Sequence, residues 1–419
     1  MSDFTRDEEL NALVRQLNRR EREDPADAVG GDPGGQGARR AAGRDAALET
    51  VLTEVVRRDA TDLLLVPGSP PVLRVAGRLA PLDAPALEEE DVRAMLAPHL
   101  PDRVWQAIRD QGSADLSLRV TAASGAGRGA VRFRVNLHRQ RGQFAAAIRV
   151  LPREIPTLAS LGLPATLAEL VRPARGLVLM CGPTGSGKSS TLAALVGEIN
   201  RTRTCHVITI EEPVEFEHPN IRSLVEQVEV GSDAPSFAAA LRAALRQDPD
   251  VLLVGEMRDL DTIATVLTAA ETGHLVLSTL HTSDAAQAVH RVVDVFPGVQ
   301  QAQIRQQLAL VLNAIVCQQL VPRADGCGRV PAVEVLLANP AVRQHIRSER
   351  VQNLHTEITL GKRNGMLALE ESLARLVRAG AISPEEAQIR ATYPEELASL
   401  LKEPGSEDRG PGTGPERRR

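Results

Sequence analysis

Four short apolar runs recur along the middle of the chain, at residues 177–181, 207–211, 251–255 and 275–279. Each run is followed by polar residues and then by a segment with helical periodicity. Short, fully apolar runs are typical of strands that are buried on both faces. Strands that alternate with helices indicate a parallel sheet with crossover helices, and ligands bind at the carboxyl ends of such strands. We therefore expect an α/β domain over residues 160–345.

A different pattern precedes this domain. Residues 114–120, 130–137 and 145–151 alternate apolar and polar positions, which predicts strands with one buried face. Residues 62–66 and 72–75 flank a Pro/Gly turn and read as a hairpin-like pair. Helical patterns lie on either side of that pair, at residues 46–58, 88–96 and 101–110. The sequence thus predicts a small α+β domain over residues 45–152, joined by a proline-containing linker to the second domain.

The two ends of the chain carry other patterns. Residues 346–402 read as a C-terminal helical piece, in which Ser383-Pro384-Glu385-Glu386 is typical of a helix start. The first 44 residues are rich in charge, glycine and proline, and so are residues 403–419. Segments of this composition cannot bury a core, so we expect a disordered arm and a disordered tail.

Composition narrows the functional classes. A hydrophobic content of 43% suffices for real cores, and a net charge of −5 argues against nucleic-acid binding through bulk charge. The four cysteines show no C-x-x-C spacing, which favours reduced thiols in a cytoplasmic protein. We find no apolar run near the roughly 20 residues of a membrane span, and no signal peptide. Any membrane role would therefore need a partner protein.

The first apolar run leads directly into a glycine-rich loop of the form Gly-x-x-x-x-Gly-Lys-Ser. Strand, glycine loop and helix together predict a phosphate-binding P-loop, because backbone N–H groups and a helix start can surround phosphate oxygens. Lys188 could reach the β- and γ-phosphates of ATP, and the Ser189 hydroxyl could hold Mg²⁺. Only three of the 49 basic residues are lysines, and one of them stands in this loop. The predicted nucleotide-binding residues are Gly182, Pro183, Thr184, Gly185, Ser186, Gly187, Lys188, Ser189 and Ser190.

Carboxylates follow the next two apolar runs. Glu211, Glu212 and Glu215 crowd the end of the second run, and Glu256 ends the third. Crowded carboxylates resist ionisation unless a cation or hydrogen-bond donors lie nearby, and Mg²⁺-ATP would supply the cation. One carboxylate could orient or deprotonate the attacking water, and Glu256 could hold Mg²⁺. The alternatives are an acidic surface turn and a surface glutamate after a buried strand.

Histidines and arginines complete the candidate set. His274 and His281 flank the fourth run, too far apart to bind one metal, and His281 could sense the γ-phosphate. Either histidine could instead be structural. Arginines at positions 132, 134, 139 and 141 form a dense positive stretch in the first domain. They could face nucleotide phosphates or form a solvated strand face.

Taken in order, these four motifs resemble the Walker A, Asp, Walker B and His boxes of the secretion ATPases of type II and type IV pilus systems. The resemblance covers roughly residues 45–400. It implies a RecA-like ATPase domain preceded by a PAS-like α+β domain, working as a homo-hexamer with ATP and Mg²⁺. It also implies that Glu215 is the general base, that Glu256 is the Walker B acid and that His274 and His281 are the His-box pair. Arginines such as Arg134, Arg139 and Arg141 would close over the phosphates.

Two features favour the pilus-retraction branch of that family. Residues 340–347 are similar to its Ala-Ile-Arg-Asn-Leu-Ile-Arg-Glu motif, and the tetracysteine zinc element of assembly and type II enzymes is missing. The chain departs from the family pattern at Glu212, where aspartate is usual, and at Gln344-His345. The resemblance implies a motor that retracts a type IV pilus by acting on an inner-membrane platform protein. The alternatives are an assembly or type II secretion ATPase, a non-hydrolysing accessory subunit of the motor and, least favoured, a DNA translocase.

Overall fold

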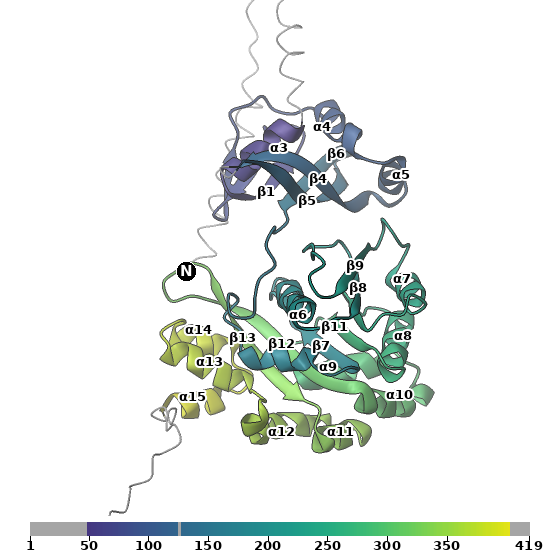
Figure 1. Cartoon of the computed structure of the whole chain (residues 1–419). Coiled ribbons are helices and arrows are strands. Elements are labelled where there is room, and N and C mark those ends of the chain that lie inside the picture. The colour runs from purple at the N-terminus through teal and green to yellow at the C-terminus, as the bar shows by residue number, and fades with distance from the viewer. Residues whose placement is uncertain (1–47, 125–126, 403–419) are drawn as a thin grey trace, which may run out of the picture. The chain divides into compact units, whose positions relative to one another are not determined.

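A computed structural model describes residues 48–124 and 127–402 (Figure 1). The predicted N-terminal arm and C-terminal tail lie outside the described residues. The chain divides into two compact units, the first ending at Pro152 and the second beginning at Arg153. Each unit has its own sheet and its own core, and each is described by itself.

The first unit is built on a six-stranded antiparallel sheet in the order β3-β2-β1-β6-β5-β4. Every helix and strand predicted here is present, whereas β3 was not predicted. The first unit also contains a 3-10 turn, η1, which spans Ala97–His99. The remaining elements are α3 (Leu48–Arg57), β1 (Ala60–Leu65), β2 (Val72–Val75), β3 (Arg78–Pro81), α4 (Glu89–Leu96), α5 (Asp102–Gln111), β4 (Ser113–Ser124), β5 (Gly127–Gln140) and β6 (Gln143–Val150).

The two faces of this sheet differ. The helices α3, α4 and α5 pack on one face (Figure 1). Apolar side chains such as Leu63, Phe133 and Ile148 belong to the core there and are fully buried. The period of two then places the intervening polar residues on the other face. There Arg134 on β5 pairs in register with Arg149 on β6, which pairs in register with Asp62 on β1.

The second unit is built on a seven-stranded sheet in the order β13-β12-β7-β11-β10-β8-β9. All strands run parallel except β13, which is antiparallel to β12. The four predicted strands correspond to β7, β8, β10 and β11. The strands are β7 (Gly176–Cys181), β8 (His206–Glu211), β9 (Leu224–Glu229), β10 (Val251–Val254), β11 (Leu275–Leu280), β12 (Leu312–Pro322) and β13 (Arg329–Leu337).

Helices cover both faces of this sheet, and two hydrophobic cores result. In β7, Leu177 and Leu179 face one core and Val178 and Met180 face the other. This explains the apolar runs without alternation, since side chains on both faces are buried. One core is covered by η2 (Ala165–Val171) and α6 (Lys188–Thr202), and the other by α7 (Phe237–Ala244), α8 (Leu260–Glu271), α9 (Ala285–Asp294) and α10 (Gly298–Val311).

Of the remaining helices, α12, α13 and α14 contact β12 or β13, whereas α11 packs on α10 and α15 packs on α13 (Figure 1). Ser383 caps α14 by accepting from the backbone N–H of Glu386, as predicted. The expected boundary at residue 345 falls inside α11, whose residues Val342 and Ile346 belong to the main core. These elements are α11 (Pro340–Arg347), η3 (Val351–Asn353), α12 (Leu354–Leu360), η4 (Gly361–Asn364), α13 (Leu369–Arg378), α14 (Pro384–Arg390) and α15 (Pro394–Lys402).

Candidate active site

The glycine-rich loop joins the end of β7 at Cys181 to the start of α6 at Lys188. Gly182 and Gly187 have φ angles of +140° and +89°, which L side chains rarely adopt. A Cβ atom on Gly182 would lie 2.2 Å from the carbonyl oxygen of Gln318, and one on Gly187 would lie 2.8 Å from Gln318 Nε2. Glycine is therefore required here by backbone conformation and by close approach to β12.

Gln318 on β12 supports the loop from the side, and no sequence pattern pointed to this residue. Its buried side chain donates from Nε2 to the carbonyl oxygen of Ser186 at 2.7 Å. Its Oε1 accepts from the hydroxyl of Thr191 in α6 at 2.8 Å. One buried amide thus links the loop and the helix to the strand beside β7.

The polar side chains of the loop differ in burial and in hydrogen bonding. The Lys188 ammonium donates to the carbonyl oxygens of Gly182 and Pro183, at 2.7 Å and 3.0 Å. Burial lowers the pKa of Lys188, while the charges of Cys181, Glu256 and Glu215 act in the opposite direction. The Ser186 hydroxyl is buried and has no hydrogen-bond partner among the described residues. Ser189 is exposed and Ser190 is half-buried, in the first turn of α6.

Glu256 follows β10, and its side chain contacts two other residues. Its carboxylate contacts Arg258 at 2.7 Å and the Nε2 of His281 at 3.5 Å. His281 follows β11, which lies between β7 and β10 in the sheet. The parallel order β7-β11-β10-β8 therefore brings the glycine loop, His281, Glu256 and the acidic stretch after β8 to one edge. This convergence agrees with the strand-end placement expected from the sequence.

The three carboxylates after β8 have separate environments. Glu211 accepts from the Thr209 hydroxyl at 2.7 Å and from Gln227 at 3.2 Å. Burial raises the pKa of Glu211, and the charge of Glu215 adds a smaller effect in the same direction. Glu212 is exposed and Glu215 is half-buried. Crowding is thus real, but hydrogen bonds turn Glu211 toward β9, which leaves Glu215 as the stronger candidate for chemistry.

His274 lies at the other end of β11, away from this edge. Its Nδ1 lies 2.9 Å from the carbonyl oxygen of Ala269, near the end of α8. This contact agrees with a structural role for His274, in which the imidazole ring caps the end of a helix. The His-box pair therefore divides into His281 beside Glu256 and His274 at the opposite edge of the sheet.

The candidate arginines belong to the first unit. Arg134 lies on the polar face of β5, 3.5 Å from the carboxylate of Asp115. Arg141 is exposed in the two-residue turn between β5 and β6, with φ of +49°. This arrangement matches the solvated-face alternative for Arg134 and places Arg141 at a hairpin tip.

The glycine loop, the parallel sheet and the acidic strand ends define a P-loop ATPase of the RecA-like type. A family model described as type II/IV secretion system protein matches residues 118–399. The chain belongs to this family. Within residues 48–124 and 127–402, we find no helix with both the length and the apolar character needed to cross a bilayer.

Named relatives point to one branch of the family. The type IV pilus retraction ATPase PilT of Pseudomonas aeruginosa is 42% identical over 81% of this chain and 96% of its own length. A twitching motility protein of Neisseria gonorrhoeae is 41% identical over 78% of this chain and 86% of its own. A crystal structure of the pilus retraction motor PilT with bound ADP matches with a TM-score of 0.77 and 41% identity. That match covers 85% of this chain and all of the other.

Proposed function

We propose that this protein is the ATP-hydrolysing motor that retracts a type IV pilus in twitching motility. The observation that carries the proposal is the shared sheet edge, where the Lys188 ammonium lies within electrostatic range of both Glu215 and Glu256. The similarity to PilT over most of both chains supports the retraction branch rather than the assembly branch.

The residues at this edge fit a nucleoside triphosphate with its Mg²⁺. The loop N–H groups and Lys188 would hold the phosphates, and the buried hydroxyl of Ser186 lacks the partner that a phosphate oxygen would supply. Ser189 and Glu256 would hold Mg²⁺, which when bound neutralises charge on the phosphates. The remaining loop residues Gly182, Pro183, Thr184, Gly185, Gly187 and Ser190 complete the nucleotide-binding set.

In this proposal Glu215 is the general base. Its carboxylate would orient the attacking water and accept its proton. His281 would sense the γ-phosphate through its contact with Glu256. Arg134 and Arg141 would stabilise phosphate charge when the two units close, so that hydrolysis is gated by that motion. The assembly would be a homo-hexamer acting on a platform protein at the cytoplasmic side of the inner membrane.

The direct test is steady-state hydrolysis of Mg²⁺-ATP at several protein concentrations. Activity per chain should rise with assembly, and Lys188→Ala and Glu215→Gln should each reduce it at least roughly 100-fold. Glu217→Gln is the matched control, since Glu217 is an exposed carboxylate two residues further along the same loop. Nucleotide binding without hydrolysis in the unaltered protein would favour the accessory-subunit alternative.

The direction of force needs a second experiment, in the bacterium that encodes the protein. Loss of the protein should leave surface pili in place and abolish twitching, and Glu215→Gln should do the same. Loss of the pili themselves would instead identify an assembly ATPase. Hydrolysis and direction are thus tested separately.

A further inference from the structure

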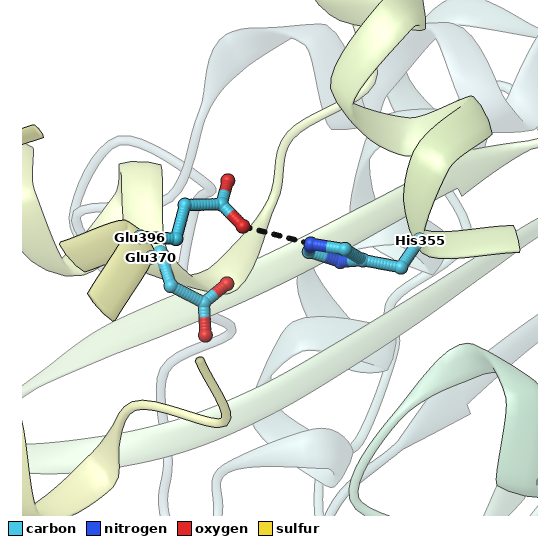
Figure 2. A group of neighbouring side chains, drawn as sticks. All are labelled: His355, Glu370 and Glu396. Atoms are coloured by element: carbon cyan, nitrogen blue, oxygen red, sulfur yellow. Dashed lines mark hydrogen bonds and ion pairs between the residues drawn. The ribbon is translucent and has the colours of Figure 1, made fainter. Parts of the chain in front are cut away.

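Three side chains from three helices gather beside β12 and β13, away from the glycine loop. They are His355 on α12, Glu370 on α13 and Glu396 on α15. Figure 2 shows the imidazole ring and the two carboxylates facing a common space. The His355 Nε2 lies 2.8 Å from Glu396 Oε2, and one ligand atom from each residue lies within 4.8 Å of the others.

Glu370 is the unusual member of this cluster, because its side chain is fully buried. Its Oε1 accepts from the backbone N–H groups of Thr392 and Tyr393, at 3.0 Å and 2.9 Å. Its Oε2 is equally buried and has no hydrogen-bond partner among the described residues. An unpartnered buried carboxylate oxygen is costly, and a bound cation would remove that cost.

The surroundings of the cluster suit a cation. The His355 ring stacks on Tyr393, with 4.1 Å between the ring centroids, and this contact fixes the plane of the ring. Glu334, a further buried carboxylate on β13, lies within electrostatic range of His355 and Glu370. The side chains of His355 and Glu396 are 22% and 28% exposed, so an ion and a water ligand can reach the cluster from solvent.

The donor set distinguishes between kinds of cation. Mg²⁺ and Ca²⁺ prefer all-oxygen sites, whereas one imidazole with two carboxylates suits zinc and related first-row ions. In a tetrahedral site with bonds of about 2.0 Å, the ligand atoms lie about 3.3 Å apart. The ligand atoms of the cluster lie within 4.8 Å of one another, so they would approach by at most about 1.5 Å to form such a site.

We propose that His355, Glu370 and Glu396 bind a divalent ion of the zinc class, with water in the remaining position. Glu370 is the preorganised ligand, because two backbone N–H groups hold its other oxygen. The ion fastens α15 to α12 and α13. The site shares no residue with the candidate nucleotide site and goes beyond the proposed motor function.

The chain supplies its own control for this proposal. His345 on α11 contacts Glu357 on α12 at 3.2 Å, and both side chains are about as exposed as those of His355 and Glu396. Among the described residues, no third histidine, cysteine or carboxylate joins this pair to complete a ligand set. Removing His345 therefore breaks a histidine–glutamate pair without removing a metal site.

The test uses the full-length protein, stripped with a chelator, desalted and kept free of nucleotide. Zn²⁺ is then titrated in competition with a chromophoric chelator. We expect the unaltered protein and His345→Gln to bind one more Zn²⁺ per chain than His355→Gln and Glu396→Gln. At that site, loss of one ligand should weaken binding by at least roughly 100-fold. Zn²⁺ should also raise the Tm of the unaltered protein and of His345→Gln, and it should not raise the Tm of His355→Gln or Glu396→Gln.

If other variants fold poorly, Glu396→Gln is the decisive variant, because Glu396 is partly exposed whereas Glu370 holds two backbone donors. Equal stoichiometry and equal affinity across all four proteins would overturn the proposal. The cluster would then be a hydrogen-bonded ion pair beside a capping carboxylate.

Discussion

The two sheets of this protein place their polar groups in different ways. In the second unit both faces of the sheet are covered by helices, so polar side chains gather where the strands end, around Lys188 and Glu256. In the first unit the described helices pack on one face of the sheet, and charged residues such as Asp62 and Arg149 lie along the other. At the strand ends Lys188 is buried and the side chain of Glu256 is only 15% exposed, whereas the side chain of Arg149 on the polar face of the first sheet is 68% exposed. Substitutions should therefore lower the free energy of unfolding much more at the strand ends of the second sheet than on the polar face of the first.

The largest effect is expected at Gly182. In Gly182→Ala the new Cβ atom would lie 2.2 Å from a backbone oxygen of β12, at a φ of +140°. We expect the free energy of unfolding to fall by about 3 kcal/mol and ATP affinity to fall roughly 100-fold. Urea denaturation and nucleotide titration measure the two effects. Gly298→Ala is the control, because nothing lies within 4 Å of a Cβ atom there. A tolerated alanine at position 182 would show that the loop is not fixed by β12.

The next effect depends on pH and concerns His218, in the loop after β8. Burial lowers the pKa of His218 to about 4, from an ordinary value of 6.5. The folded protein keeps the ring neutral while the unfolded chain takes up a proton, so stability is lost as the pH falls from 6.5 to 4. This loss should amount to about 2 to 3 kcal/mol. His218→Gln should lack this part of the acid sensitivity, and urea midpoints at pH 7 and pH 4.5 measure the difference. Identical pH dependence in both proteins would mean that the ring is solvated.

Gln318→Leu should have a somewhat smaller effect. The substitution keeps the size of the side chain but leaves the Ser186 carbonyl oxygen and the Thr191 hydroxyl without the amide. We expect a loss of about 2 kcal/mol in the free energy of unfolding, together with weaker nucleotide binding. The neighbouring Gln319→Leu is the control, since Gln319 makes only a 3.3 Å bond to the Arg390 carbonyl oxygen. Equal losses in the two variants would remove Gln318 from the support of the loop.

The smallest effect is expected on the polar face of the first sheet. Arg149 donates to Asp62 at 2.8 Å, but its side chain is 68% exposed. Exposed pairs contribute little because solvent screens them, so Arg149→Ala should cost less than about 1 kcal/mol. Chemical denaturation at low and high salt measures the effect, which should shrink further as salt rises. A loss as large as that of Gln318→Leu would contradict the distinction between the two sheets.

The strand–helix alternation and the phosphate loop could be predicted because both are local patterns. The predicted runs at residues 177–181 and 275–279 are buried on both faces, and the lack of apolar–polar alternation in them predicts this. The strands β9, β12 and β13 were not predicted, although they complete the sheet. Strand order depends on contacts between distant segments, such as Cys181 beside Cys317, and no local pattern encodes it.

The same limit applies to the site. Glu256 and His281 could be placed at strand ends, but their contact depends on β10 and β11 being neighbours. Gln318 gave no signal, because a pair of glutamines in an apolar segment matches no motif. His274 and His281 flank the same apolar run, and the structure separates them by the end of β11 at which each lies. The roles of Glu215, Arg134 and Arg141 in catalysis stay predictions.

Three parts of the second unit meet along β12 and the residues directly before it. Near its start, Arg343 of α11 donates to the carbonyl oxygens of Ala309 and Leu310 at the end of α10, directly before the strand. In its middle, Gln318 holds the glycine loop. Near its end, Val321 packs in the small core formed by α13, α14 and α15. A load applied to the C-terminal helices would therefore strain the same strand that positions the phosphate loop, which is the mechanical connection that a force-generating enzyme needs.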